Sequence, residues 1–352
     1  MAGGTTNQAE TGDGLAPIAA AAIEQWMADH VAGFAGPLRI QKFAGGQSNP
    51  TYRLSTRDRR YVLRKQPPGD LPRGAHDVLR EARVMSALHG SSIPVPKIEA
   101  ASPDSGLVGS PFFIMELVDG RIFWDTAFRV IPKGERAAYF DAMNATIAAL
   151  HQLDHEALGL SDFGRRGNYF VRQINRWSRQ YADDPDGGRS ADMDALIEWL
   201  PQAIPPDDET RLIHGDFRCD NLIFHAADAR IVAVLDWELS TLGHPLADFA
   251  YHALLYRIPG DIVAGIGGED PASLGLPTEG DYVDSYCQRT GRSAIPQWDF
   301  YIAFNLFRLA AILHGIKARV ARGNASSANA RERAAKFPAL ARLARQAMEN
   351  CR

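Results

Sequence analysis

The sequence feature that most constrains the fold is a polar loop followed by a short apolar hairpin. Residues 214 to 221 read His-Gly-Asp-Phe-Arg-Cys-Asp-Asn, and the apolar run Ile-Val-Ala-Val-Leu ends in Asp236. Asp216 offers a carboxylate that can take a proton from a hydroxyl, while Asn221 and Asp236 offer the hard oxygen ligands that Mg²⁺ prefers beside phosphates. The structural alternative is a turn that His214 and Asp216 shape and Asn221 caps. Suitable residue types in the right order around a predicted hairpin favour the chemical interpretation.

Composition excludes several classes of protein. The 352 residues are enough for two lobes with a core each. A hydrophobic fraction of 45% with 23% charged residues is ordinary for globular proteins, and a net charge of −4 gives no general basic field for nucleic acid or an anionic membrane. No uncharged apolar run is long enough to span a membrane, and the scattered cysteines form neither a disulfide framework nor a metal site. We expect a cytoplasmic protein with a disordered leader at 1–14 and no nucleic-acid or membrane partner.

The hydrophobic pattern predicts an α+β chain in two lobes. Strand-like segments and turns run from residue 38 to 116, with helices at 16–31 and 76–89, and helical periodicity dominates after residue 120. Two short strand signals, at 222–225 and 230–235, interrupt the later helices. We predict an N-terminal lobe at 15–115 with an antiparallel sheet and a helix, a hinge at 116–120 and a helical lobe at 121–352.

Two features of the N-terminal lobe suit an anionic ligand. The turn Gly45-Gly46-Gln47-Ser48-Asn49 lets backbone amides approach an anion, although an ordinary glycine-containing hairpin has the same sequence features. Arg64 and Lys65 end a predicted strand, and alternation puts them on opposite faces. One of these cations could reach phosphates, with Glu81 on the following helix to orient it, or both could be solvated.

Other polar residues fit either a functional or a structural role. The strand that ends at Glu116 can present the Glu116 carbonyl and the Val118 amide to an adenine edge, or it is simply a buried strand. Asp248 near the start of a predicted helix either caps that helix or accepts hydrogen bonds from the loop at 214–221. Four further candidates for contact with a substrate are Arg172, Arg176, Arg308 and His314, for which packing or solvation is the alternative.

The span from about 38 to 350 resembles the aminoglycoside phosphotransferase/choline kinase-like family. The motifs occur in order: Gly-Gly-Gln-Ser-Asn, Val-Leu-Arg-Lys, Arg-Glu-Ala-Arg-Val-Met, Ile-Met-Glu-Leu-Val-Asp-Gly, His-Gly-Asp-x4-Asn, Leu-Asp-Trp-Glu and Gly-His-Pro-Leu-Ala-Asp. The segment from Gly159 to Tyr181 is typical of the branch found as the kinase-like domain fused to some acyl-CoA dehydrogenases. The resemblance implies a bilobal protein-kinase-like fold that uses ATP with Mg²⁺ and transfers the γ-phosphate to a small-molecule hydroxyl.

The resemblance also assigns roles by position. The implied catalytic set is Asp216 as base with His214, and Asn221 and Asp236 as metal ligands. The implied nucleotide-binding set is Gly46, Ser48, Asn49, Arg64, Glu81, Glu116 and Val118, with Lys65 as the alternative cation.

Several interpretations of the function stay open at this level. The crowding of Arg165, Arg166, Arg172, Arg176 and Arg179 favours an anionic acceptor, such as a hydroxy acid or hydroxyacyl thioester, over a polycationic antibiotic. A nucleotide-binding pseudokinase is the alternative without turnover, and the intact catalytic set disfavours it. A protein kinase is disfavoured because no Asp-Phe-Gly and Ala-Pro-Glu activation segment is present.

Overall fold

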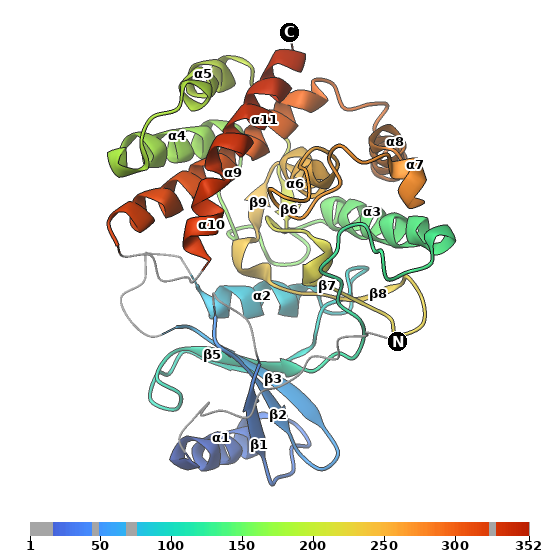
Figure 1. Cartoon of the computed structure of the whole chain (residues 1–352). Helices are drawn as coiled ribbons and strands as arrows, with labels where there is room; N and C mark the ends of the chain where they lie inside the picture. The colour runs from blue at the N-terminus through green and yellow to red at the C-terminus, as the bar shows by residue number, and fades with distance from the viewer. Residues whose placement is uncertain (1–16, 44–48, 68–75, 324–328, 352) are drawn as a thin grey trace. The chain divides into compact units, whose positions relative to one another are not determined.

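The computed structural model describes residues 17–43, 49–67, 76–323 and 329–351, and the chain divides into two compact units (Figure 1). The sheet unit comprises the chain up to Ile122 together with Glu156–Leu160 and Asp220–Ser240. The helical unit comprises Phe123–His155, Ser161–Cys219 and the chain from Thr241 onward. The leader expected at 1–14 lies outside the described residues.

A five-stranded antiparallel sheet organises the sheet unit. Its order is β1-β2-β3-β5-β4, and the strands are β1 (Arg39–Lys42), β2 (Thr51–Ser55), β3 (Arg60–Lys65), β4 (Ile98–Ser102) and β5 (Phe112–Glu116). Helix α1 (Pro17–His30) packs on the sheet through a core that joins Ile23 and Met27 to Leu54, Leu63 and Ile114. Successive side chains of a strand point to opposite faces of the sheet. Because Leu63 points into this core, Arg64 points to the other face.

Helix α2 (Val78–Leu88) packs against β4 and β5 and carries Glu81. Asp77 caps its first turn by accepting a hydrogen bond from the Arg80 backbone amide, at 3.0 Å. The buried residues of α2 recur at helical spacing, and the carboxylate of Glu81 is buried with them. The sequence therefore places one acidic side chain on an otherwise apolar helix face.

The hairpin of β7 (Leu222–Phe224) and β8 (Ile231–Val234) belongs to the sheet unit, although the sequence predicted it within a lobe spanning 121–352. Backbone hydrogen bonds explain this difference. The amides of Arg121 and Phe224 each donate to the other's carbonyl at 2.8 Å, and the Val234 amide donates to Pro94 at 2.8 Å. A side chain at Gly120 would collide with the Phe224 carbonyl, so a glycine is required at this crossing.

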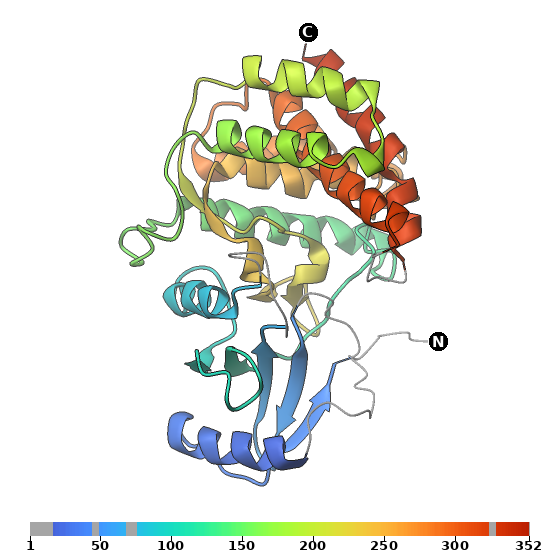
Figure 2. The same cartoon turned by 90° about the vertical axis from the view of Figure 1, so that its left-hand side faces the viewer.

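Helices dominate the helical unit (Figure 2). They are α3 (Arg136–Gln152), α4 (Tyr169–Ala182), α5 (Ala191–Trp199), α6 (Pro245–Ala253), α7 (Pro271–Leu274), α8 (Glu279–Thr290), α9 (Trp298–Ala321), α10 (Ala330–Ala335) and α11 (Phe337–Asn350). Helix α9 packs against α4, α6, α10 and α11. Within the described ranges, it is the single helix long and apolar enough to cross a membrane, but 72% of its most apolar window is buried inside the molecule. Its composition is therefore that of a core helix.

A two-stranded ribbon positions the polar loop of the helical unit. Strand β6 (Arg211–Ile213) pairs antiparallel with β9 (Thr241–Gly243) and ends immediately before His214. Strand β9 in turn ends two residues before α6 begins at Pro245. A side chain at Gly243 would meet Ile213 and Tyr169, so the ribbon packs closely at that point. The ribbon thereby fixes both the loop and the start of α6.

Candidate active site

Three carboxylates surround a buried arginine in the sheet unit. The Nε of Arg64 lies 2.8 Å from Glu81 Oε2, and its Nη2 lies 2.6 Å from Asp236 Oδ1 and 3.9 Å from Glu238 Oε2. The Arg64 side chain is 13% exposed and that of Glu81 only 2%. Strand β3, helix α2 and the segment after β8 therefore bring Arg64, Glu81 and Asp236 together.

The charges in this cluster perturb one another. Burial raises the pKa of Glu81 to about 7, although Arg64 opposes the shift. Burial alone would lower the pKa of Arg64, but Glu81 and Asp236 more than offset it, so the guanidinium stays charged. The cluster contains one charged cation and several carboxylates. It can therefore bind the negative oxygens of a phosphate only if further positive charge is present beside Arg64.

Lys65 does not take part in this cluster. Its Nζ donates a hydrogen bond to the Val108 carbonyl, and burial lowers its pKa. The sequence left Arg64 and Lys65 as alternatives, and the ion pairs of Arg64 single it out as the cation of the cluster.

Asn49 also contributes to this side of the sheet unit. It is 1% exposed, and its Nδ2 donates to Glu238 Oε2 at 3.2 Å. Among the described residues its buried Oδ1 has no hydrogen-bond partner, which is costly unless a ligand or water satisfies it. Gly46 and Ser48, predicted in the same turn, lie outside the described residues.

Asp236 has an unusual backbone. Its φ of 62° and ψ of 61° are left-handed, a conformation that non-glycine residues adopt rarely and mostly as Asn or Asp. The Leu235 amide donates to the Asn221 carbonyl at 2.8 Å, so the β7–β8 hairpin brings the backbones of Asn221 and the segment before Asp236 together. Strain of this kind is typical of functional positions.

The donor set of the sheet unit fits Mg²⁺. Asp236 and Glu238 supply carboxylate oxygens, Asn221 can supply an amide oxygen, and Mg²⁺ is usually held by one or two carboxylates plus phosphates and water. In the part of the chain that the structure describes, no group of three or more His, Cys, Asp or Glu side chains forms a metal cage of protein ligands alone. Zinc sites need such a cage of protein ligands, whereas magnesium–nucleotide sites do without one because phosphates and water complete the coordination.

The segment predicted to face adenine ends β5. Glu116 pairs with Tyr61 across the sheet, its amide donates to the Lys97 carbonyl at 2.9 Å, and its Oε1 accepts from the Lys97 amide at 3.0 Å. Glu116 and Val118 are both half-buried. The side chain of Glu116 therefore fastens β5 to the chain before β4, and the adenine contact stays a prediction.

In the helical unit, Asp248 holds the backbone of the polar loop. It is 2% exposed; its Oδ2 accepts from the His214 amide and its Oδ1 from the Gly215 amide, both at 2.8 Å. His151 Nε2 lies 3.2 Å from Oδ2, and His151 Nδ1 lies 2.7 Å from the Tyr286 hydroxyl. Burial alone would raise the pKa of Asp248, but the bonds from His151 and His214 lower it. The helix cap is His244, which accepts from Leu246, so Asp248 serves the loop instead of capping.

His214 shapes the same loop from inside. Its side chain is fully buried, and Nδ1 accepts a hydrogen bond from the Asp216 amide at 3.2 Å. The His214 ring meets Phe217 edge-on. His214, which the sequence placed in the catalytic set, therefore supports the backbone of Asp216 in this structure.

Asp216 itself accepts a hydrogen bond from a tyrosine that the sequence prediction missed. The Tyr251 hydroxyl lies 2.5 Å from Asp216 Oδ1. Tyr251 follows Asp248 by three residues on α6, a spacing that puts both on one helix face, and this spacing is the signal that could have found it. Arg308 lies over the Tyr251 ring at 5.3 Å and donates to the Gly215 carbonyl at 3.2 Å.

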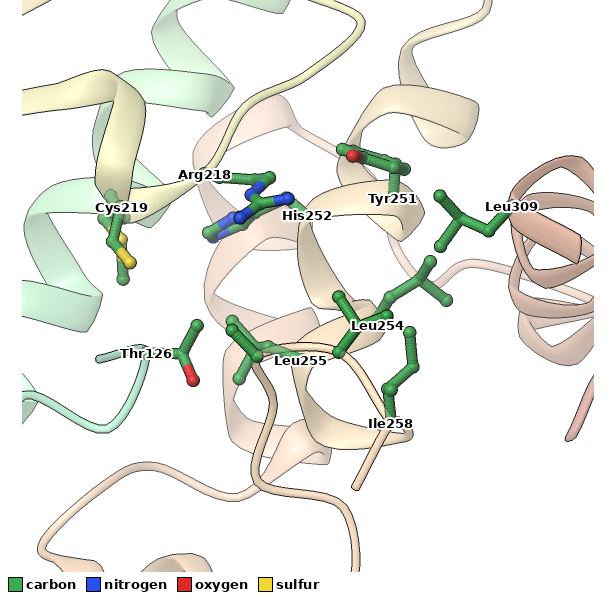
Figure 3. A pocket seen from close by; sticks show the side chains of 12 residues that line it. Thr126, Arg218, Cys219, Tyr251, His252, Leu254, Leu255, Ile258 and Leu309 are labelled. Carbon is green, nitrogen blue, oxygen red and sulfur yellow. The ribbon is translucent and has the colours of Figure 1, made fainter. Parts of the chain in front are cut away.

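A pocket opens in the helical unit beside Tyr251 (Figure 3). Its polar lining includes Thr126, Arg218 and His252, and apolar side chains make up most of the rest: Met143, Leu254, Leu255, Ile258, Val263, Ala264 and Leu309. Figure 3 shows Tyr251, Arg218 and His252 along one side and Leu254, Leu255 and Ile258 along the other. A mostly apolar lining with a few polar groups is typical of small-ligand sites.

Burial keeps the histidine of this pocket neutral. His252 Nδ1 donates to the Phe217 carbonyl at 3.2 Å, and Nε2 accepts from the Tyr282 hydroxyl at 2.6 Å. Burial lowers the pKa of His252 to about 4. The charge on the pocket wall therefore comes from the Arg218 guanidinium.

The other predicted substrate residues take different places. His314 is 1% exposed, lies 2.8 Å from the Gly188 carbonyl, and packs against Tyr181 and Phe337. Packing accounts for its position, and its role as a substrate contact stays a prediction. Arg172 donates to the Arg165 carbonyl at 2.8 Å, and exposed Arg176 lies over Trp177. Neither lines the pocket described above, and their role as substrate contacts stays a prediction.

The fold is that of the kinase-like phosphotransferases. Residues 39–280 match the phosphotransferase enzyme family, and the chain belongs to it. A solved structure from Ralstonia eutropha, provisionally described as an aminoglycoside phosphotransferase, is 46% identical with a TM-score of 0.86 and covers 94% of this chain and 98% of its own. An APH(4)-Ia aminoglycoside phosphotransferase solved with AMP-PNP and hygromycin B shares the fold, at a TM-score of 0.59 and 16% identity over 93% and 98% of the two chains.

The curated relatives point to one branch. Mouse acyl-CoA dehydrogenase family member 10 is 43% identical over 311 residues, which is 88% of this chain and 29% of the relative. Human acyl-CoA dehydrogenase family member 11 is 39% identical over 311 residues, 87% of this chain and 40% of the relative. The chain thus spans less than half the length of these relatives. The predicted fold and family resemblance, including this branch, are confirmed.

Proposed function

We propose that this protein transfers the γ-phosphate of ATP, with Mg²⁺, to the hydroxyl of a small hydroxy acid or hydroxyacyl thioester. The observation that carries the proposal is the buried Arg64, held by Glu81 at 2.8 Å and by Asp236 at 2.6 Å. Protein kinases use the same kind of cation–carboxylate pair to hold nucleotide phosphates. A chain that kept this pair only for stability would bury Glu81 and most of Arg64 at a desolvation cost.

The sheet unit is the proposed nucleotide-binding part. Arg64 would pair with the phosphates of the nucleotide, and Asn221 and Asp236 would hold Mg²⁺, which would supply positive charge to neutralise the transferred group. The buried Oδ1 of Asn49, which has no hydrogen-bond partner within the described ranges, offers a further polar contact on this side. These residues bind and orient the nucleotide, and positioning of this kind supplies most of the catalysis in phosphoryl transfer.

The helical unit is the proposed acceptor-binding part. Asp216 takes the proton of the acceptor hydroxyl, and the pocket beside Tyr251 holds the acceptor's carbon chain. Its apolar lining suits an aliphatic chain, and Arg218 suits an anionic or strongly polar head group. A polycationic aminoglycoside would bring its charges against Arg218 and against leucines, which disfavours an antibiotic acceptor.

The test is Mg²⁺-dependent ATP consumption across hydroxy acids that differ in chain length and hydroxyl position, their coenzyme A thioesters, choline and an aminoglycoside. We expect turnover with the aliphatic hydroxy compounds and loss of at least about a thousandfold in Asp216→Asn, because the general base is removed. Wild-type rates that survive Asp216→Asn would refute the mechanism. ATP binding without transfer to any acceptor would favour the alternative of a pseudokinase.

A further inference from the structure

The catalytic-loop aspartate of the helical unit is tied to a phenol on α6. Tyr251 donates to Asp216 Oδ1 over 2.5 Å, a short distance for an O–H···O⁻ bond and within the range of charge-assisted ones. The terminal torsion of an aspartate is broad, so each donor that binds the carboxylate narrows the range of angles over which it presents its oxygens. A donor at this distance sets the plane of the carboxylate.

The phenol is itself held in place. Tyr251 and Asp248 share a face of α6, and Asp248 binds the amides of His214 and Gly215 at 2.8 Å. Arg308 of α9 stacks over the Tyr251 ring at 5.3 Å and donates to the Gly215 carbonyl at 3.2 Å. The ring and the backbone that precedes Asp216 therefore share the same supports.

The phenol remains a donor in the conditions of an assay. Burial raises the pKa of Tyr251 well above its usual value, and the charge of Asp216 raises it further. A phenol that keeps its proton cannot accept the proton of the substrate. Tyr251 is therefore suited to orient the base, Asp216, and not to act as the base itself.

We propose that Tyr251 is the positioning residue of the transfer reaction: it orients the Asp216 carboxylate toward the acceptor hydroxyl, from the wall of the pocket in which the acceptor lies. The proposal rests on the proposed function, and adds to it a residue outside the His-Gly-Asp-x4-Asn motif. Because the Tyr251 ring lines the pocket, an acceptor that fills the pocket contacts the group that aims the base.

The experiment compares Tyr251→Phe with Tyr256→Phe, using the hydroxy acid from the panel that the wild-type protein phosphorylates fastest. Tyr256 is a matched control because it is a buried tyrosine three residues after α6 whose hydroxyl donates to the Pro277 carbonyl at 3.1 Å, away from Asp216. We expect Tyr251→Phe to lower kcat by roughly 10- to 100-fold, the scale of a misplaced catalytic group, with KM for ATP within about twofold. Tyr256→Phe should leave both parameters within about twofold.

A double-mutant cycle separates positioning from packing. In an Asp216→Asn background, Tyr251→Phe should change the residual rate by less than about twofold, because there is no longer a carboxylate to orient. Arg308→Met provides a second variant that keeps the phenol but removes the cation over its ring, and it should lower kcat less than Tyr251→Phe does. Melting temperatures establish that each variant is folded.

Four outcomes overturn the inference. A Tyr251→Phe kcat within twofold of wild type shows that the phenol does not orient the base, while leaving the proposed function intact. Equal losses in Tyr251→Phe and Tyr256→Phe, or an undiminished effect in the Asp216→Asn background, show general packing. A wild-type protein that phosphorylates no acceptor refutes the proposed function itself, and this inference with it.

Discussion

Replacing Asp248 by Asn tests how strongly one buried carboxylate holds the catalytic loop. Asp248 accepts from the amides of His214 and Gly215, one on each oxygen, and shares Oδ2 with His151 Nε2. Asparagine keeps a single acceptor oxygen. Its best orientation places that oxygen at the Oδ2 position, where it still serves His214 and His151, and turns its own NH₂ group toward the Gly215 amide.

The magnitude follows from that arrangement. The Gly215 amide loses its acceptor in a buried site, which costs about 1–3 kcal/mol, and the bond to His214 loses its charge assistance, about 1 kcal/mol more. The sum is about 2–4 kcal/mol of unfolding free energy. For a unit of roughly two hundred residues, such a loss lowers Tm by about 10 °C. The displaced Gly215 peptide also shifts Asp216, so kcat should fall by at least about tenfold.

The assay pairs calorimetry with steady-state kinetics, and Asp281→Asn is the matched control. Asp281 is exposed in the same unit, where its Oδ2 accepts from the Thr278 hydroxyl at 2.6 Å in the capping box of α8. The same chemical change there should cost no more than about 1 kcal/mol and leave kcat unchanged. If Asp248→Asn melts within about 2 °C of wild type and keeps its kcat, the carboxylate does not hold the loop and the reasoning is wrong.

Three further outcomes are expected. Arg64→Met removes the cation that faces Glu81 and Asp236, so unfolding free energy should drop by about 3 kcal/mol and ATP affinity by at least about tenfold in calorimetric titration; unchanged ATP affinity would contradict the phosphate role. His252 has its pKa lowered to about 4 by burial, so protons bind the unfolded chain first and stability should fall by about 3 kcal/mol as pH drops from about 6.5 to 4. Urea unfolding should show a shallower fall in His252→Gln, and equal slopes would count against this assignment. Val263→Trp narrows the pocket and should raise KM for long-chain acceptors about tenfold without changing KM for ATP. An equal rise in KM for acceptors of every chain length would show that the acceptor's carbon chain does not bind in this pocket.

Much of the fold was predictable because its patterns are strong. Period-two alternation in β3 put Arg64 and Lys65 on opposite faces, and the family resemblance implied that Glu81 of α2 is the partner of Arg64. The kinase-like resemblance covered most of the chain and placed the remaining elements in order. Strands β6 and β9 were missed, because three residues carry too little pattern to be separated from a loop.

The parts of the site that the sequence did not predict depend on tertiary contacts. Alternation left Lys65 as a rival of Arg64, and only the packing of the chain near Val108 shows where its ammonium group binds. Tyr251 was hidden because a tyrosine on an apolar helix normally predicts core packing, and its partner lies thirty-five residues earlier. The unit boundary within residues 214–221 was equally hidden, since it depends on backbone hydrogen bonds from the β7–β8 hairpin to distant segments.

The left-handed backbone of Asp236 has a consequence for how this protein can change over evolution. That conformation admits glycine, asparagine and aspartate with little strain, whereas the ion pair to Arg64 admits only aspartate and glutamate. The two sets share a single member. Glutamate, the usual conservative exchange, keeps the charge but forces an unfavourable backbone, and asparagine keeps the backbone but loses the charge. Any single substitution of Asp236 therefore loses either the favourable backbone or the ion pair, so this position has no neutral single substitution.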